Sequence, residues 1–216
     1  MTISDKNEAL LQSIMESFDR IAYIDSGELP EIDLYMDQVT TFIDSRMKQT
    51  TRHPETDKIL TKTMINNYAK NNLIPPPVKK KYSKEHMLIL IFIYYMKSVM
   101  SITDIQQILG PLADRYFGGK GNMPLMDIYD EIFSLRDEEV EVLKKDVEAS
   151  FASSRKLFED EAEEDKEFLQ HFAFICMLCV DVYTKKLLIE KLVDQMREDA
   201  AVKTKDGAAN QGKEHK

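Results

Sequence analysis

Residues 60–109 constrain the fold of this 216-residue chain more than any other segment. A short polar helix is predicted to close at Asn72, because asparagine tolerates the left-handed backbone that ends a helix. Prolines 75–77 then exclude helix and force an extended path. After three lysines, Ser83 offers a cap for a strongly apolar helix over about 84–99. The segment therefore predicts two helices joined by a rigid, basic connection.

Most of the remaining chain shows apolar residues at three- and four-residue steps, which predicts amphipathic helices. Only seven glycines and seven prolines occur, which argues against a turn-rich all-β fold. The expected helices cover residues 5–22, 35–47, 61–71, 84–99, 103–116, 134–158 and 165–198. We therefore predict an all-α protein with a small wing. Its expected parts are an N-terminal helix and linker (1–34), a head (35–117), a C-terminal helical region (123–199) and a disordered tail (200–216).

Charge is distributed unevenly along the chain. The formal net charge is −9, which by itself argues against a partner such as nucleic acid. Residues 46–86, however, hold ten Lys and Arg against three acids, a local balance of +7, whereas residues 127–168 have a balance of −10. A basic module joined to an acidic one fits a head that reads DNA and a body that avoids phosphates. Solvated helix faces of either sign are the alternative.

The chain lacks the signals of secretion, membrane insertion and catalysis. Its first residues do not have the basic and apolar layout of a secretory signal, and no uncharged apolar stretch of about 18 residues occurs. With two cysteines, we expect a cytoplasmic protein. Cys176 and Cys179 form a C-x-x-C inside an apolar run, and no second pair completes a zinc site, so core packing is favoured. No nucleophile signature is found, and we expect neither an enzyme nor a cofactor.

Residues 64–76 read Met-Ile-Asn-Asn-Tyr-Ala-Lys-Asn-Asn-Leu-Ile-Pro-Pro, and residues 79–86 read Lys-Lys-Lys-Tyr-Ser-Lys-Glu-His. This order resembles the winged helix-turn-helix of the MerR family of bacterial transcription regulators. That family commonly has Thr-Leu-Arg-Tyr-Tyr-Glu-Arg-Glu-Gly-Leu-Leu-Pro-Pro, so Asn66 and Asn67 stand where it has arginine and tyrosine. The wing is also shorter than usual. The chain is similar to a YkrK-like group of uncharacterised bacterial proteins, a domain of unknown function with a MerR-like head and no assigned effector.

The resemblance implies that the head binds double-stranded DNA. Asparagine amides suit adenine in the major groove, and lysines hold phosphates, which position a protein without reading sequence. A helix frayed into its cap and a solvated turn are the alternatives. The predicted DNA-binding residues are Lys62, Thr63, Asn66, Asn67, Tyr68, Lys70, Lys79, Lys80, Lys81 and Tyr82.

The helix expected over 165–198 has too wide an apolar surface for one solvated helix. We therefore expect a homodimer, whose interface includes Phe168, Phe172, Ile175, Leu178 and Val182. The helix over 5–22 could instead cover this surface and leave a monomer. The predicted function is sequence-specific DNA binding by a transcription regulator acting as a dimer. The alternative, from another class, is a helical protein-interaction module that has lost DNA binding.

Overall fold

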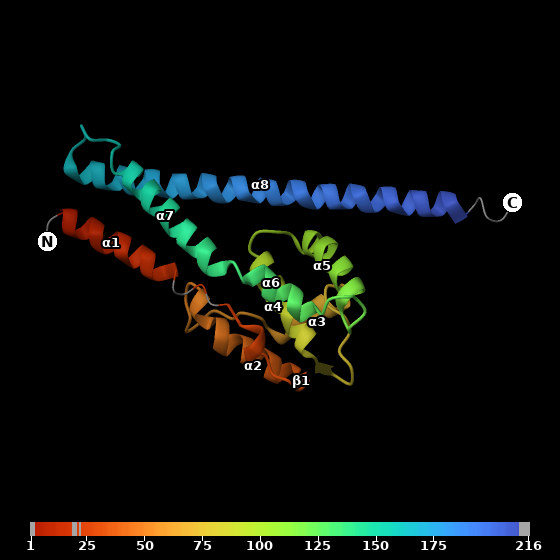
Figure 1. Cartoon of the computed structure of the whole chain (residues 1–216). Coiled ribbons are helices and arrows are strands. Elements are labelled where there is room, and N and C mark those ends of the chain that lie inside the picture. The colour runs from red at the N-terminus through yellow and green to blue at the C-terminus, as the bar shows by residue number, and fades with distance from the viewer. Residues whose placement is uncertain (1–2, 19–20, 22, 212–216) are drawn as a thin grey trace. The chain divides into compact units, whose positions relative to one another are not determined.

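The computed structural model describes residues 3–18, 21 and 23–211, and this part is mostly helical with a small antiparallel sheet (Figure 1). The predicted fold class is confirmed. No helix in the described part combines the length and apolarity needed to span a membrane. The elements are α1 (Ile3–Phe18), η1 (Ser26–Glu28), β1 (Leu34–Tyr35), α2 (Met36–Met47), η2 (Lys48–Thr50), α3 (Lys62–Lys70), β2 (Lys81–Tyr82), α4 (Lys84–Met96), α5 (Ile102–Tyr116), α6 (Leu125–Phe133), α7 (Arg136–Ser154) and α8 (Glu163–Gln211).

The chain forms two compact units, and each unit combines segments that are distant in sequence. The first unit comprises Met1–Leu29, Thr40–Ile59 and Met126–Tyr183. The second comprises Pro30–Val39, Leu60–Leu125 and Thr184–Lys216. This division does not follow the sequential parts that we expected, because strand pairing and helix packing bring distant segments together.

Helix α3 belongs to the second unit and begins and ends where the sequence predicts. The side chain of Thr61 accepts a hydrogen bond from Met64 N at 3.2 Å, which satisfies an amide that the helix leaves unpaired. Asn72 closes the helix with a φ of 55°. Ile65 and Tyr68 are buried on one side of the helix. The predicted left-handed closure at Asn72 is confirmed.

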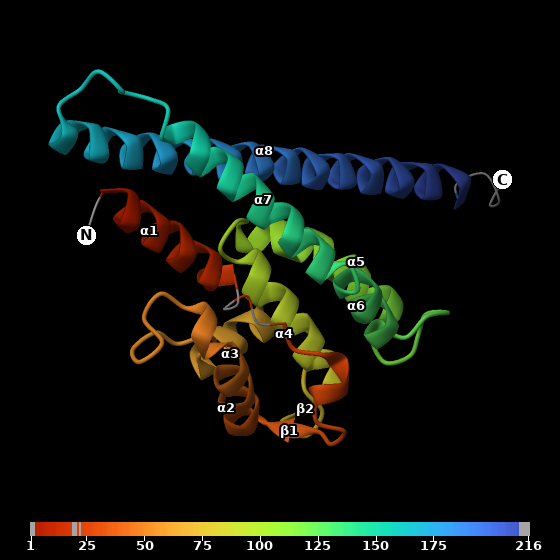
Figure 2. The ribbon, with the colours of Figure 1, turned by 60° about the vertical axis from the view of Figure 1, so that its left-hand side comes forward.

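Helix α4 lies in the core of the second unit and contacts α5 and β2. Every residue from His86 to Ile93 is buried, as expected for a helix that is apolar on all sides. Strands β1 and β2 run antiparallel side by side, with Leu34 opposite Tyr82 (Figure 2). The chain between residues 30 and 37 is thereby held against the segment that precedes α4.

The first unit is held together by α1 on α7 and by the hairpin of α7 and α8. Helix α1 covers Ile3–Phe18 and packs on α7; of the helix expected over 5–22, residues 19, 20 and 22 lie outside the described part. The Gln170 side-chain nitrogen donates hydrogen bonds to the carbonyl oxygens of Arg155 (2.8 Å) and Leu157 (2.7 Å), which ties α8 to the end of α7. Phe151 and Phe174 meet edge to face at 5.3 Å.

Helix α8 is longer than predicted. It continues through residues 200–211, where we expected a disordered tail, so the expectation is corrected for that segment; residues 212–216 lie outside the described part. The alanines at 200, 201, 208 and 209 explain the extension, since alanine has the highest helix propensity. In the second unit, an ion pair of 2.5 Å between Arg197 and Asp104 joins α8 to the first turn of α5.

Candidate nucleic-acid interface

One side of α3 is polar and exposed. Its members are separated by one, three or four residues, and helical geometry therefore places them on a single face. Ile65 and Tyr68 occupy the opposite, buried side. The exposed face consists of Lys62, Thr63, Asn66, Asn67 and Lys70. Five of the predicted DNA-binding residues are thus brought together on one helix.

The two asparagines in this face are available for recognition. Within the described part of the chain, neither side-chain amide of Asn66 or Asn67 has a hydrogen-bond partner. A free amide carries both a donor and an acceptor, and it can therefore pair with N6 and N7 of adenine in the major groove. The buried side of α3, which includes Ile65 and Tyr68, holds this helix in place.

The lysines of the wing, the segment between α3 and α4, lie in a tight turn. Lys81 N donates a hydrogen bond of 2.9 Å to the carbonyl oxygen of Val78, which closes a four-residue turn. Its two central residues, Lys79 and Lys80, have φ angles of 51° and 66°. Positive φ at both positions is the geometry of a type I′ turn, which normally favours glycine, asparagine or aspartate. Both lysines are exposed at the tip.

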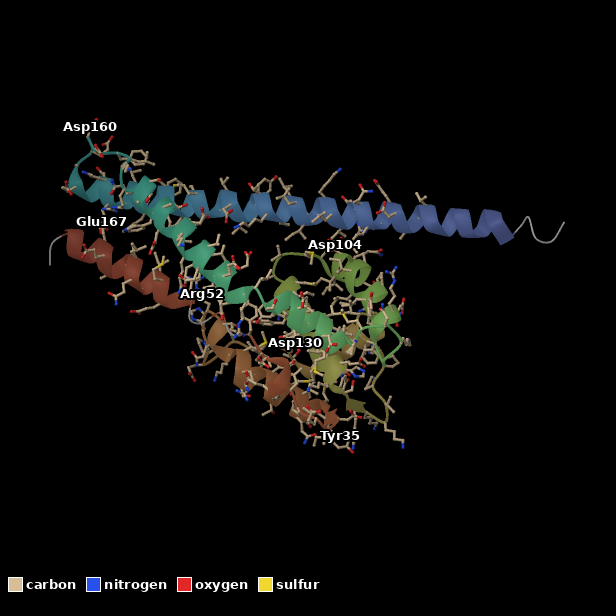
Figure 3. The ribbon with its side chains drawn as sticks, viewed as in Figure 1. Tyr35, Arg52, Asp104, Asp130, Asp160 and Glu167 are labelled. Atoms are coloured by element: carbon tan, nitrogen blue, oxygen red, sulfur yellow. The ribbon has the colours of Figure 1, made fainter. Side chains whose placement is uncertain are left out.

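Residues 35–37 connect α3 with the wing. The Lys81 ammonium lies 5.2 Å from the centre of the Tyr35 ring, and Lys62 forms an ion pair with Asp37 (Figure 3, where Tyr35 is labelled). Both partners come from the end of β1 and the start of α2. The polar face of α3 and the turn of the wing therefore share one neighbouring segment.

The sheet also brings acids to the basic segment, which sequence analysis missed. Glu31 lies 2.7 Å from Lys84, and Asp37 pairs with Lys62. These acids precede residue 46 and were outside the basic window, and only strand pairing places them here. In contrast, the described structure shows no ion pair for Lys70 or for the two lysines at the tip of the wing. The unpaired positive charge is thus smaller than the local balance suggests.

Two predicted contact residues belong to the core and are corrected. Tyr68 and Tyr82 are only 6% and 3% exposed, and burial raises the pKa of both hydroxyl groups. Tyr68 lies three residues after the buried Ile65 and therefore points to the same side of α3. Tyr82 pairs with Leu34 in the sheet. Neither ring is available to DNA, and we remove both from the candidate set.

His86 fixes the junction between the wing and α4. The backbone nitrogen of Ser83 donates a hydrogen bond of 3.0 Å to His86 Nδ1, in a capping box in which histidine takes the place of the usual glutamate. Burial lowers the pKa of His86, although the carbonyl groups of Pro75 and Pro76 and the charge of Asp33 act in the opposite direction. The neutral ring is the form that accepts the Ser83 hydrogen bond.

A polar hollow of about 330 Å³ in the first unit contains groups that already pair with one another. Ser26 donates a hydrogen bond of 2.7 Å to Asp130, which is labelled in Figure 3. The guanidinium of Arg136 lies 5.6 Å from the centre of the Tyr23 ring. No group of three metal-ligating side chains occurs among the described residues. The hollow itself therefore indicates no particular ligand.

The predicted dimer-interface residues of α8 differ in their exposure. Four of its residues, Phe168, Phe172, Ile175 and Val182, are exposed, whereas Leu178 is half-buried. The two cysteines, which we expected in a packed core, are exposed on the same helix and are corrected. In the apolar run that contains them, Phe174 is buried and packs against Phe151 of α7.

Comparison with known proteins places half of the chain in a family. A family model described as a domain of unknown function (DUF1836) matches residues 24–132. This range includes α3, the wing, α4 and α5, and it ends before α7. No curated protein and no solved structure matches the chain.

Proposed function

We propose that this chain, which belongs to the DUF1836 family, is a sequence-specific DNA-binding protein, a bacterial transcription regulator that acts as a dimer. One observation carries the proposal: an exposed helix face with two unpartnered amides shares a neighbouring segment with a turn that presents two unpaired lysines. Base-reading groups and phosphate-binding groups then act together, as specific recognition requires.

In this proposal α3 is the recognition helix of a MerR-like head. Asn66 and Asn67 lie on its exposed face and read bases in the major groove. Lys79 and Lys80, at the tip of the wing, hold a phosphate of the backbone. The buried tyrosines take no direct part, and they fix the orientation of α3 and of the wing instead.

The first experiment measures binding to genomic DNA fragments as a function of salt. Replacing Lys79, Lys80 and Lys81 together by Ala should weaken binding to all sequences and lower the salt slope by about two to three units, because fewer counterions are released. The matched control replaces the exposed Lys145, Lys156 and Lys191 by Ala, which changes the net charge equally and should leave binding nearly unchanged.

A second experiment tests sequence reading by selecting bound DNA from a random pool. Asn66→Ala and Asn67→Ala should each relax the preference at a particular base and cost about 1–3 kcal/mol on the selected site. Their affinity for unselected DNA should stay close to that of the parent protein. If the folded parent protein binds no DNA at low salt, the proposal is refuted.

The second candidate is a helical protein-interaction module that has lost DNA binding. It is favoured by the acids that pair with Lys62 and Lys84, because these ion pairs reduce the charge available for phosphates. The two candidates differ in one result. A module of this kind would retain its fold and its self-association while showing no shift of any DNA fragment.

A further inference from the structure

The exposed side of α8 has a regular apolar spacing. Phe168, Phe172, Ile175, Cys179 and Val182 follow one another at steps of four, three, four and three residues. All five are exposed, and this alternation is the spacing with which two helices pack along a common seam. Leu178 lies at the edge of the seam, four residues after the buried Phe174 and four before Val182, and is half-buried.

This exposed apolar surface is large enough that we expect a second surface to pack against it. Phe168, Phe172 and Tyr183 are 68%, 55% and 60% exposed, which leaves on the order of 350 Å² of aromatic surface in water. Ile175, Val180 and Val182 enlarge the patch further, and each is more than half exposed. A standard interface buries about 800 Å² from each partner, and the aromatic part of this patch alone reaches nearly half of that area. Helix α1 packs on α7 and leaves the seam uncovered.

The two ends of the seam carry opposite charges. Asp165 precedes Phe168 by three residues, and Lys186 follows Val182 by four, so both continue the same spacing. Around Asp165, residues 163–167 hold four acids and one lysine. Lys186 lies 3.7 Å from Glu190 in its own helix, an exposed pair that can exchange partners. The labelled Glu167 marks the acidic end in Figure 3.

We propose that two copies of the chain pair through this seam with their α8 helices antiparallel, about a two-fold axis close to Ile175 and Cys176. An antiparallel pair places the acidic end of each seam opposite Lys186 of the second copy, whereas a parallel pair sets like charges against each other. The apolar residues are self-complementary about this axis, because Phe172 meets Cys179 and Phe168 meets the turn of Val182 and Tyr183. A symmetric pair of this kind is closed and does not polymerise.

This inference deepens the dimer part of the proposed function, and it is tested without DNA. Light scattering at micromolar concentration should give twice the 25.0 kDa mass of the chain, and Phe172→Glu should give a monomer with unchanged helix content, since the side chain is exposed. A monomeric parent protein refutes the inference but does not affect the proposed DNA contact by α3. A dimer that binds no DNA refutes the proposed function but does not affect the proposed pairing through the seam.

The charged ends distinguish the two orientations. In the antiparallel dimer, Lys186→Glu creates two repulsive contacts and should weaken association about fivefold. Adding Asp165→Lys restores opposite charges and should recover the affinity. In a parallel dimer each substitution replaces one like-charged pair by another, so neither the weakening nor the recovery of association would be seen. That result would refute the antiparallel arrangement.

Cross-linking of single-cysteine variants gives an independent readout. With the axis close to Ile175, a dimer of the chain with Ile175→Cys and both native cysteines replaced by Ser carries two thiols that face each other across the seam, and diamide should yield a disulfide-linked dimer. The two Cys179 residues would lie about 10 Å apart along the helices, so Cys176→Ser should not cross-link. The opposite pattern, with Cys179 cross-linking readily, would indicate a parallel pair and overturn the proposal.

Discussion

Lys80 stands at a backbone position that is unfavourable for a side chain, and replacing it by glycine is expected to stabilise the fold. Its φ of 66° is in the left-handed region. A residue with a Cβ loses about 1–2 kcal/mol there, while glycine loses about 0.5–1 kcal/mol more backbone entropy on folding. The balance predicts that Lys80→Gly is more stable than Lys80→Ala by about 0.5–1 kcal/mol.

Comparing these two variants separates strain from charge. Both remove the same ammonium, so both should weaken DNA binding by similar factors, whereas only the glycine variant relieves the backbone. Urea denaturation followed by circular dichroism measures the stability difference, because the chain has no tryptophan. Lys81, in β2, provides the control: there the backbone is extended, and Lys81→Gly should be less stable than Lys81→Ala. If Lys80→Gly proves less stable than Lys80→Ala, the assigned strain is refuted.

Two further predictions concern buried polar groups. Because the folded pKa of His86 is lowered by burial, the unfolded chain binds more protons, and stability should fall as the pH drops below about 6.5. His86→Gln, which retains an acceptor but no titration, should show a shallower loss between pH 7.5 and 5.5 in urea denaturation; an unchanged slope would contradict this. Tyr129→Phe removes the 2.7 Å hydrogen bond from the Tyr129 hydroxyl to the Ile24 carbonyl oxygen and should cost about 1–3 kcal/mol in the same assay. A cost near zero would show that the carbonyl finds another partner.

The parts of the fold that depend on neighbours in sequence could be predicted, and α3 shows why. Thr61 caps the helix and Asn72 closes it, and both effects act within a few residues. The polar face of α3 follows from helical periodicity alone. The sequence likewise showed a strongly apolar helix after Ser83, and the burial of α4 from His86 to Ile93 agrees with that composition.

The features that sequence analysis missed depend on contacts between distant segments. Nothing near Lys84 indicates that Glu31 will reach it, because only the pairing of β1 with β2 brings them together. Tyr82 was assigned to the surface for the same reason, since its partner Leu34 lies far away in the chain. The position of Cys179 could not be predicted either, because an apolar run does not reveal which of its sides another helix will cover.

The tight turn of the wing also determines how a protease meets this chain. Trypsin cleaves after lysine, but it must hold its substrate in an extended form, and the left-handed backbone of Lys79 and Lys80 does not fit that requirement. Cleavage there has to wait until the hydrogen bond between Lys81 and Val78 opens. The rate at which trypsin cuts at residues 79–81 therefore reports local opening of the wing, and a bound phosphate backbone should slow it. Digestion could then map the contact surface on the native protein without any substitution.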